Sequence, residues 1–223
     1  MSPRSAWVRR SPKGTFLQHL LGDPDDNACA ARRNRRARHR HAERQHPSRR
    51  RIRRERRGSA RQVADVVANV RAVLDAARDS GAAVFHNVIV VRPEQPVGGS
   101  NAPILRMLGP ESLAAGSWGA AIVEGIDVRA DEIVLERIRM SPFHRTALDV
   151  MLRNLGITDV IVVGVWTNMA MEHTARAAAD HGYHVTVVSD ATSSINAEWQ
   201  NAALNYALTN IATITDTAEL RGA

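Results

Sequence analysis

Short runs of valine and isoleucine, each the length of a single β-strand, set the tightest limit on how this chain can fold. The run at residues 160–165 (VIVVGV) shows no alternation of polar and apolar residues, which is typical of a strand buried on both faces. Runs of similar character lie at residues 82–91, 132–136, 184–189 and 211–215. These five segments are predicted to be strands.

Amphipathic helices are predicted between the apolar runs. At residues 63–77, valine, leucine and alanine recur with the three- and four-residue spacing of one helix face, and Gly81 follows as a helix stop. Further helices are expected at residues 148–155, 168–181 and 196–208. This alternation predicts an α/β fold, a three-layer α/β/α sandwich with a mostly parallel, Rossmann-like sheet. We expect five strands, or six if the amino-terminal region supplies one.

Charge divides the chain near residue 60. Residues 1–62 hold 19 basic and 5 acidic groups, a net charge of +14, whereas residues 63–223 carry a net charge of −7. Residues 31–61 contain 15 arginines and only one large aliphatic side chain, Ile52, so this stretch cannot bury enough apolar surface to order its backbone. We therefore predict two parts: an Arg-rich segment at residues 1–58, disordered or altered in reading frame, and a folded domain at residues 59–223.

Composition excludes several classes of protein. The chain has one cysteine, Cys29, which rules out a disulfide-stapled secreted module, and it has no apolar run that approaches a membrane span. The histidines at positions 39, 41 and 46 lack acidic or thiol partners at metal-ligand spacing. We expect a cytoplasmic protein that uses no metal and no cofactor and makes no membrane contact.

Ligands of an open parallel sheet bind outside the carboxyl ends of its strands. Three segments are predicted to lie there: the turn at residues 166–170, the stretch from Arg137 to Phe143, and the neighbourhood of His86. The first of these opens a helix, whose free amides favour an anion or an oxyanion.

Two adjoining segments carry a family resemblance. Residues 164–194 (GVWTNMAMEHTARAAADHGYHVTVVSDATSS) resemble the G-V-x-T-N-x-C-V-x-x-T-A-R-x-A-x-x-x-G-Y-x-V-x-V-x-x-D-A segment of the isochorismatase-like, or cysteine hydrolase, superfamily. Residues 136–164 are similar to that superfamily's K-x-x-x-S-A-F-x-x-T-x-L-x-x-x-L-x-x-x-G-I-x-x-L-x-x-x-G. With the weaker match at residues 116–120, the resemblance covers residues 60–220.

The resemblance implies a hydrolase of small amides or enol ethers, and a homo-oligomer. The superfamily's amidases use a cysteine, an aspartate and a lysine, whereas its isochorismatases lack the cysteine. Here the cysteine position falls on Ala170 and the lysine position on Arg137, or alternatively Arg139. The resemblance therefore implies a Cys-independent route and an impaired site, in which Arg137 holds an anionic substrate and the turn from Trp166 through Thr167, Asn168 and Met169 binds it.

Two of the proposed substrate contacts have structural alternatives. Trp166 either stacks on a planar substrate or fills space at the turn. His86 is either a ligand-binding residue or a hydrogen-bonded histidine of the core. Phe143 is assigned to substrate binding from its place beside the Arg137 segment.

The resemblance also implies a first strand that ends in aspartate, and we find none before the helix at residue 60. A shift of reading frame between residues 28 and 60 would produce such an Arg-rich stretch. Alternatively, the stretch is an arm that contacts nucleic acid through its arginines. The domain itself is either an impaired hydrolase or a catalytically silent module that binds a small ligand or a partner.

Overall fold

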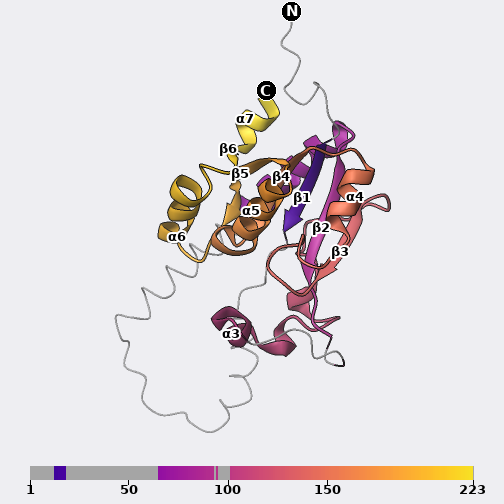
Figure 1. Cartoon of the computed structure of the whole chain (residues 1–223), viewed down its shortest axis with the longest axis vertical. Helices are drawn as coiled ribbons and strands as arrows, with labels where there is room; N and C mark the ends of the chain where they lie inside the picture. Colours follow the sequence, from indigo (N-terminus) through magenta and orange to yellow (C-terminus); the bar gives the residue numbers. More distant parts are fainter. Residues whose placement is uncertain (1–12, 19–64, 93, 95–100, 223) are drawn as a thin grey trace, which may run out of the picture.

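A computed structural model describes residues 13–18, 65–92, 94 and 101–222, and within them a six-stranded sheet of order β3-β2-β1-β4-β5-β6. Every neighbouring pair of strands is parallel. The strands are β1 (Lys13–Gln18), β2 (Ala83–Ile89), β3 (Ile133–Arg137), β4 (Asp159–Val165), β5 (His184–Ser193) and β6 (Thr213–Thr215). Helices lie against this sheet (Figure 1), which confirms the predicted α/β/α sandwich.

The sheet includes a strand that the sequence analysis did not find. β1 occupies the centre, where Gly14 to Gln18 align with Ala83 to Asn87 of β2 on one side and with Val160 to Gly164 of β4 on the other. The statement that the first strand is missing was therefore wrong, and the six-strand alternative holds. β1 lies on the amino-terminal side of the predicted boundary at residue 58, so the sheet draws on both sides of it. The whole Arg-rich stretch at residues 31–61 falls outside the described residues.

Alternating residues of the central strand β4 face two separate hydrophobic cores. Val160 and Val162 pack with the helices α4 (Leu148–Asn154) and α5 (Glu172–Asp180). Ile161 and Val163 pack instead with the helix at residues 65–79 and with Leu220 of α7 (Thr217–Gly222). This period of two places a helical layer on each face, as a doubly covered parallel strand requires.

Two predicted helices begin or end in a π-helical segment. Thr167–Met171 (η3) forms one such segment directly before α5, and Ala203–Ala207 (η4) follows α6 (Ala197–Ala202). The stretch at residues 92–131, expected to be irregular, contains α3 (Pro103–Ser112) and a short 3-10 helix, η2 (Trp118–Ala120). Figure 1 shows α3 beyond the end of the sheet toward which β1 points. No helix in the described ranges is long and apolar enough to cross a membrane.

A buried ionic cluster joins three elements on the helix 65–79 face. Glu132 Oε1 accepts a hydrogen bond from Arg78 Nε at 2.7 Å, and Glu132 Oε2 lies 2.8 Å from His86 Nε2. Burial opposes ionisation of this carboxyl, but hydrogen bonds from Arg78, the backbone amide of Arg129 and His86 lower its pKa to about 2. The cluster thereby ties the helix to β2 and to the start of β3.

Substituting Glu132→Gln should destabilise the fold by on the order of 3 kcal/mol at pH 7, because Arg78 would lose its buried partner. The pKa of Glu132 in the folded protein, about 2, lies below its ordinary value of 4.5. The stabilisation is therefore complete above pH 4.5 and is lost as the pH falls toward 2, so urea denaturation should show wild type and variant converging in that window.

The matched control is Glu136→Gln, because Glu136 is half exposed and pairs with Arg92 at the surface. It should change the free energy of unfolding by less than about 1 kcal/mol at any pH. Equal losses in the two variants would contradict the role given to the buried cluster.

Candidate functional site

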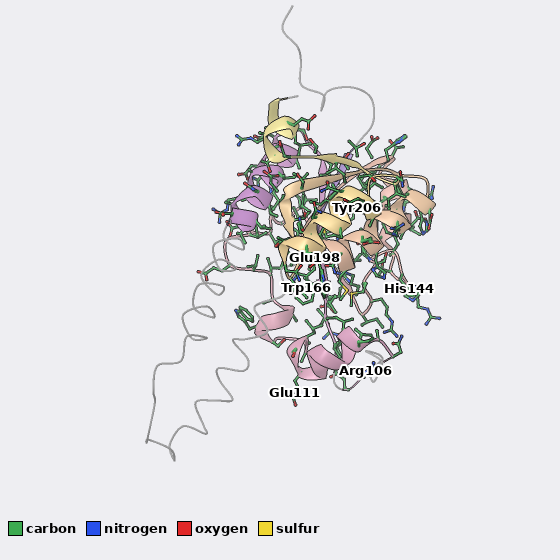
Figure 2. All side chains as sticks on the ribbon, turned by 90° about the vertical axis from the view of Figure 1, so that its left-hand side faces the viewer. Arg106, Glu111, His144, Trp166, Glu198 and Tyr206 are labelled. Carbon is green, nitrogen blue, oxygen red and sulfur yellow. The ribbon has the colours of Figure 1, made fainter. Side chains whose placement is uncertain are left out.

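A pocket lies at the carboxyl ends of β2, β3 and β4. It is partly open to solvent, and its walls come from the strand ends, α3, η2 and the η3 segment. The strand register places Ile89 of β2 beside Arg137 of β3, both at this edge of the sheet. Figure 2 shows Trp166 on the side of the sheet that faces α3. The described lining residues are Ile89, Ile104, Gly119, Ala120, Arg137, Met140, Val165, Trp166, Met169 and Ala170.

Arg137 is the only ionisable side chain among the described residues that line this pocket. Its side chain is 4% exposed, and its Nη1 donates a hydrogen bond to the carbonyl oxygen of Arg139. Its Nε is buried and has no hydrogen-bond partner among the described residues. Burial lowers the pKa of this guanidinium to about 9, so it remains charged at neutral pH. The fold therefore carries a buried cation for which the described part of the chain provides no carboxylate.

The turn after β4 contains five of the predicted site residues, and three of them line the pocket. Trp166, Met169 and Ala170 line the pocket. Ala170 and Arg137, at the cysteine and lysine positions of the family resemblance, therefore line the same pocket. Trp166 also packs against the core beneath helix 65–79, so it both fills space and faces the pocket. Thr167 is fully buried, and its Oγ1 has no partner among the described residues. The peptide bond between Val165 and Trp166 is cis.

A polar link that the sequence analysis missed holds this turn to the end of β5. Ser194 Oγ donates a hydrogen bond to Asn168 Oδ1 at 2.9 Å and accepts one from the Asn168 backbone amide at 3.3 Å. Asn168 therefore faces Ser194 and is not among the residues that line the pocket. Ser194 follows directly after β5, a position at which a side chain can reach the ligand edge of the sheet.

The structure places two predicted substrate contacts away from the pocket. His86 lies in the middle of β2, where it pairs with Glu132, which agrees with the core-histidine alternative. Phe143 packs on the α4–α5 core, with its ring stacked on His181 at a centroid distance of 5.1 Å. The expectation that these two residues lie at the ligand site was wrong about their location.

Several pocket residues had only a weak sequence signal. Gly119 and Ala120 belong to the five-residue match at residues 116–120, and they line the pocket through η2. A Cβ on Gly119 would meet the Ser112 carbonyl oxygen at 2.1 Å, so only glycine lets η2 approach α3 this closely. Ile104 and Met140 carried no signal, because single apolar side chains in a stretch expected to be irregular show no period. Among the described residues, no group of histidine, cysteine, aspartate or glutamate side chains could hold a metal ion.

Comparison with known proteins shows which family this chain is similar to. The model of the isochorismatase domain matches residues 50–219. The ureidoacrylate amidohydrolase RutB of Agrobacterium fabrum is 30% identical over 153 residues, which cover 63% of this chain and 67% of that protein. Nicotinamidase 3 of Arabidopsis thaliana is 36% identical over 99 residues, 44% of this chain and 50% of that protein. Across several curated relatives, the matched part spans 32% to 67% of their length.

Solved structures agree on the fold. The crystal structure of an isochorismatase family protein from Desulfovibrio vulgaris aligns with a TM-score of 0.72 at 21% identity, over 96% of this chain and 98% of that one. The parallel sheet, the pocket at its carboxyl edge and the match over most of the chain together define an α/β protein of the cysteine hydrolase type. The chain belongs to the isochorismatase family.

Substituting Arg137→Met should leave the fold at least as stable as wild type, and more stable by about 1–4 kcal/mol at pH 7, because the variant removes a buried charge that lacks a counter-ion. Arg137's pKa in the folded protein, about 9, lies below its ordinary value. The destabilisation by the buried Arg137 charge is therefore complete below pH 9 and shrinks as the pH rises above 9. The stability gained by Arg137→Met should be smaller at pH 10 than at pH 7.

Thermal and urea denaturation at the two pH values measure this difference. Arg92→Met serves as the control, because Arg92 is 40% exposed and pairs with Glu136 at the surface; its stability should stay within about 1 kcal/mol of wild type. A large loss of stability in Arg137→Met alone would show instead that the protein itself neutralises this guanidinium.

Proposed function

We propose that this chain binds a small planar amide or enol ether in the pocket at the carboxyl edge of the sheet and hydrolyses it slowly, without a cysteine nucleophile. Two relatives support the amide class by name, a ureidoacrylate amidohydrolase and a nicotinamidase. The observation that carries the proposal is the presence of Arg137, Trp166 and Ala170 in one apolar pocket.

Each pocket element has a proposed role in hydrolysis. Arg137 holds an anionic group of the substrate, and Trp166 lies along its flat body. The backbone amides at the start of the η3–α5 helix favour the negative charge that develops on the carbonyl oxygen. Water then adds its oxygen to the carbonyl carbon, the carbon–nitrogen bond breaks, and a proton from the water passes to the leaving nitrogen. No thiol takes part in this route.

A second candidate is a catalytically silent family member that binds the same kind of ligand. One observation favours it: the described lining residues include no cysteine, serine, histidine, aspartate or glutamate that could act as nucleophile, acid or base. Under this alternative, the pocket keeps its ligand but does not turn it over.

Introducing Ala170→Cys together with Arg137→Lys should raise ammonia release from ureidoacrylate by about 10²-fold or more, provided that a carboxylate of the chain reaches the site. The control pair is Ala120→Cys with Arg137→Lys, which puts a thiol elsewhere in the same pocket and should give no gain.

Wild type itself should release ammonia faster than Arg137→Met. Identical background rates in wild type and Arg137→Met would favour the silent module, and no gain in Ala170→Cys would argue against a usable carboxylate.

A third proposal concerns the Arg-rich stretch, which we propose contacts nucleic acid. The support is compositional: 15 arginines lie within residues 31–61, ahead of a part of the chain that is net acidic. Deleting residues 31–58 should abolish salt-sensitive binding to duplex DNA in a filter or anisotropy assay. This deletion retains β1, whereas removal of residues 1–58 would take away the central strand. Binding that survives the shorter deletion would refute the arm.

The assembly and cellular location are further proposals. We propose a homo-oligomer in the cytoplasm, on the basis of the family resemblance and of the single cysteine in the sequence.

A further inference from the structure

The outer face of α6 and of the η4 segment that follows it carries large apolar side chains in solvent. Tyr206 is 74% exposed, and Trp199 and Ile195 are 44% and 52% exposed. Figure 1 shows α6 at the outer side of the molecule, and Figure 2, which views that side, shows Tyr206 on it. Apolar side chains that gather in this way on a folded domain mark a contact surface. We call this surface, residues 195–206, the α6–η4 face.

Two polar groups on the α6–η4 face are placed symmetrically about a small residue. Glu198 lies four residues before Ala202, Tyr206 lies four residues after it, and all three are exposed. Four residues make about one helical turn, so the three side chains lie in a row along the helix. A carboxylate accepts hydrogen bonds and a phenol hydroxyl donates one, so the two ends of this row are complementary to each other.

A second copy of the chain fits such a face, because an isologous interface needs a surface that is complementary to itself. Suppose that two α6 helices pack antiparallel about a two-fold axis through Ala202. The residue four positions before the axis then faces the residue four positions after it on the other chain. Each Glu198 carboxylate accepts a hydrogen bond from the partner's Tyr206, and this pair occurs twice. The methyl side chain of Ala202 lets the helix axes approach to about 8 Å.

The available area limits how strong this contact can be. Ile195, Trp199 and Tyr206 together offer about 350 Å² per chain, nearly half of the roughly 800 Å² that each partner buries in a stable interface. The exposed amides of Asn201 and Asn205 lie on the same two helical segments and supply a polar rim. The α6–η4 face therefore has enough area for a reversible dimer but not for an obligate one.

We propose that two copies of this chain associate through the α6–η4 face, with Ala202 at the two-fold axis and each Tyr206 on the partner's Glu198. This inference rests on the homo-oligomer proposed above and adds the surface that forms it. It also bears on the pocket, because α6 and η4 lie against η3, which contains Met169 and Ala170. Association would therefore hold the wall of the pocket to which these two residues belong.

Sedimentation velocity of the full chain over about 1–300 µM tests the proposal. Wild type should form a reversible dimer. Tyr206→Asp should weaken association by at least about 100-fold, because it removes the ring and sets two carboxylates against each other across the interface. Tyr206→Phe keeps the ring and should weaken association by about 10-fold. Glu198→Lys combined with Tyr206→Asp should recover at least about 10-fold of the lost affinity, since opposite charges again face each other.

Val150→Asp is the matched control, because Val150 is 60% exposed on α4, at the other side of the molecule (Figure 1). Its dimer dissociation constant should stay within about 2-fold of wild type. All variants should keep the thermal transition of wild type, because each substituted side chain is exposed.

Three results would overturn the proposal: a wild type that stays monomeric up to about 300 µM, association of Tyr206→Asp as tight as that of wild type, or no recovery in the double variant. A monomeric wild type would also remove the homo-oligomer proposed above. An oligomer that Tyr206→Asp leaves unchanged would keep the homo-oligomer and remove only the α6–η4 face.

Discussion

The backbone of a central parallel strand must find hydrogen-bond partners on both sides, and β1 finds them in β2 and β4. β1 joins these two strands into one sheet, and without it the ends of β2, β3 and β4 would not share an edge. That shared edge is where Ile89, Arg137 and Val165 meet to line the pocket. The site therefore depends on six residues that lie far from it in the sequence and ahead of the Arg-rich stretch.

Arg137 illustrates how such a fold can retain an unfavourable group. A guanidinium that is 4% exposed and lacks a carboxylate partner in the described residues costs stability, whereas the other buried cation, Arg78, is matched by Glu132. Arg78 therefore stabilises the fold through its carboxylate partner, whereas Arg137 is kept at the pocket at a cost in stability. Unfavourable charges of this kind are concentrated at functional sites, because a bound ligand supplies the missing partner.

Strong local patterns made most of the architecture predictable, and weak ones account for the errors. The run at residues 160–165 and the stripe at residues 63–77 leave little choice of structure, and both formed as expected. β1 (KGTFLQ) has no valine or isoleucine and is flanked by no clear helix pattern, so nothing local marks it as the centre of a sheet. Its strand conformation is fixed by pairing with segments 65 or more residues away, which single-sequence patterns do not contain.

The site was predictable only in part, for similar reasons. Arg137 and Ala170 were located by family resemblance, and the parallel register brings them to one pocket. His86 and Phe143 were assigned by proximity in sequence to strand ends, yet His86 is mid-strand and faces Glu132, a partner 46 positions away. The absence of a carboxylate beside Arg137 among the described residues could not be foreseen, because it depends on which groups the tertiary fold fails to bring near.

A crystal structure of the full chain tests the central claim most directly, namely that Arg137 is a buried cation kept at the pocket without a carboxylate of the protein beside it. The account predicts that no carboxylate oxygen of the chain lies within about 4 Å of the Arg137 guanidinium nitrogens. A carboxylate of the protein paired with this guanidinium would contradict it.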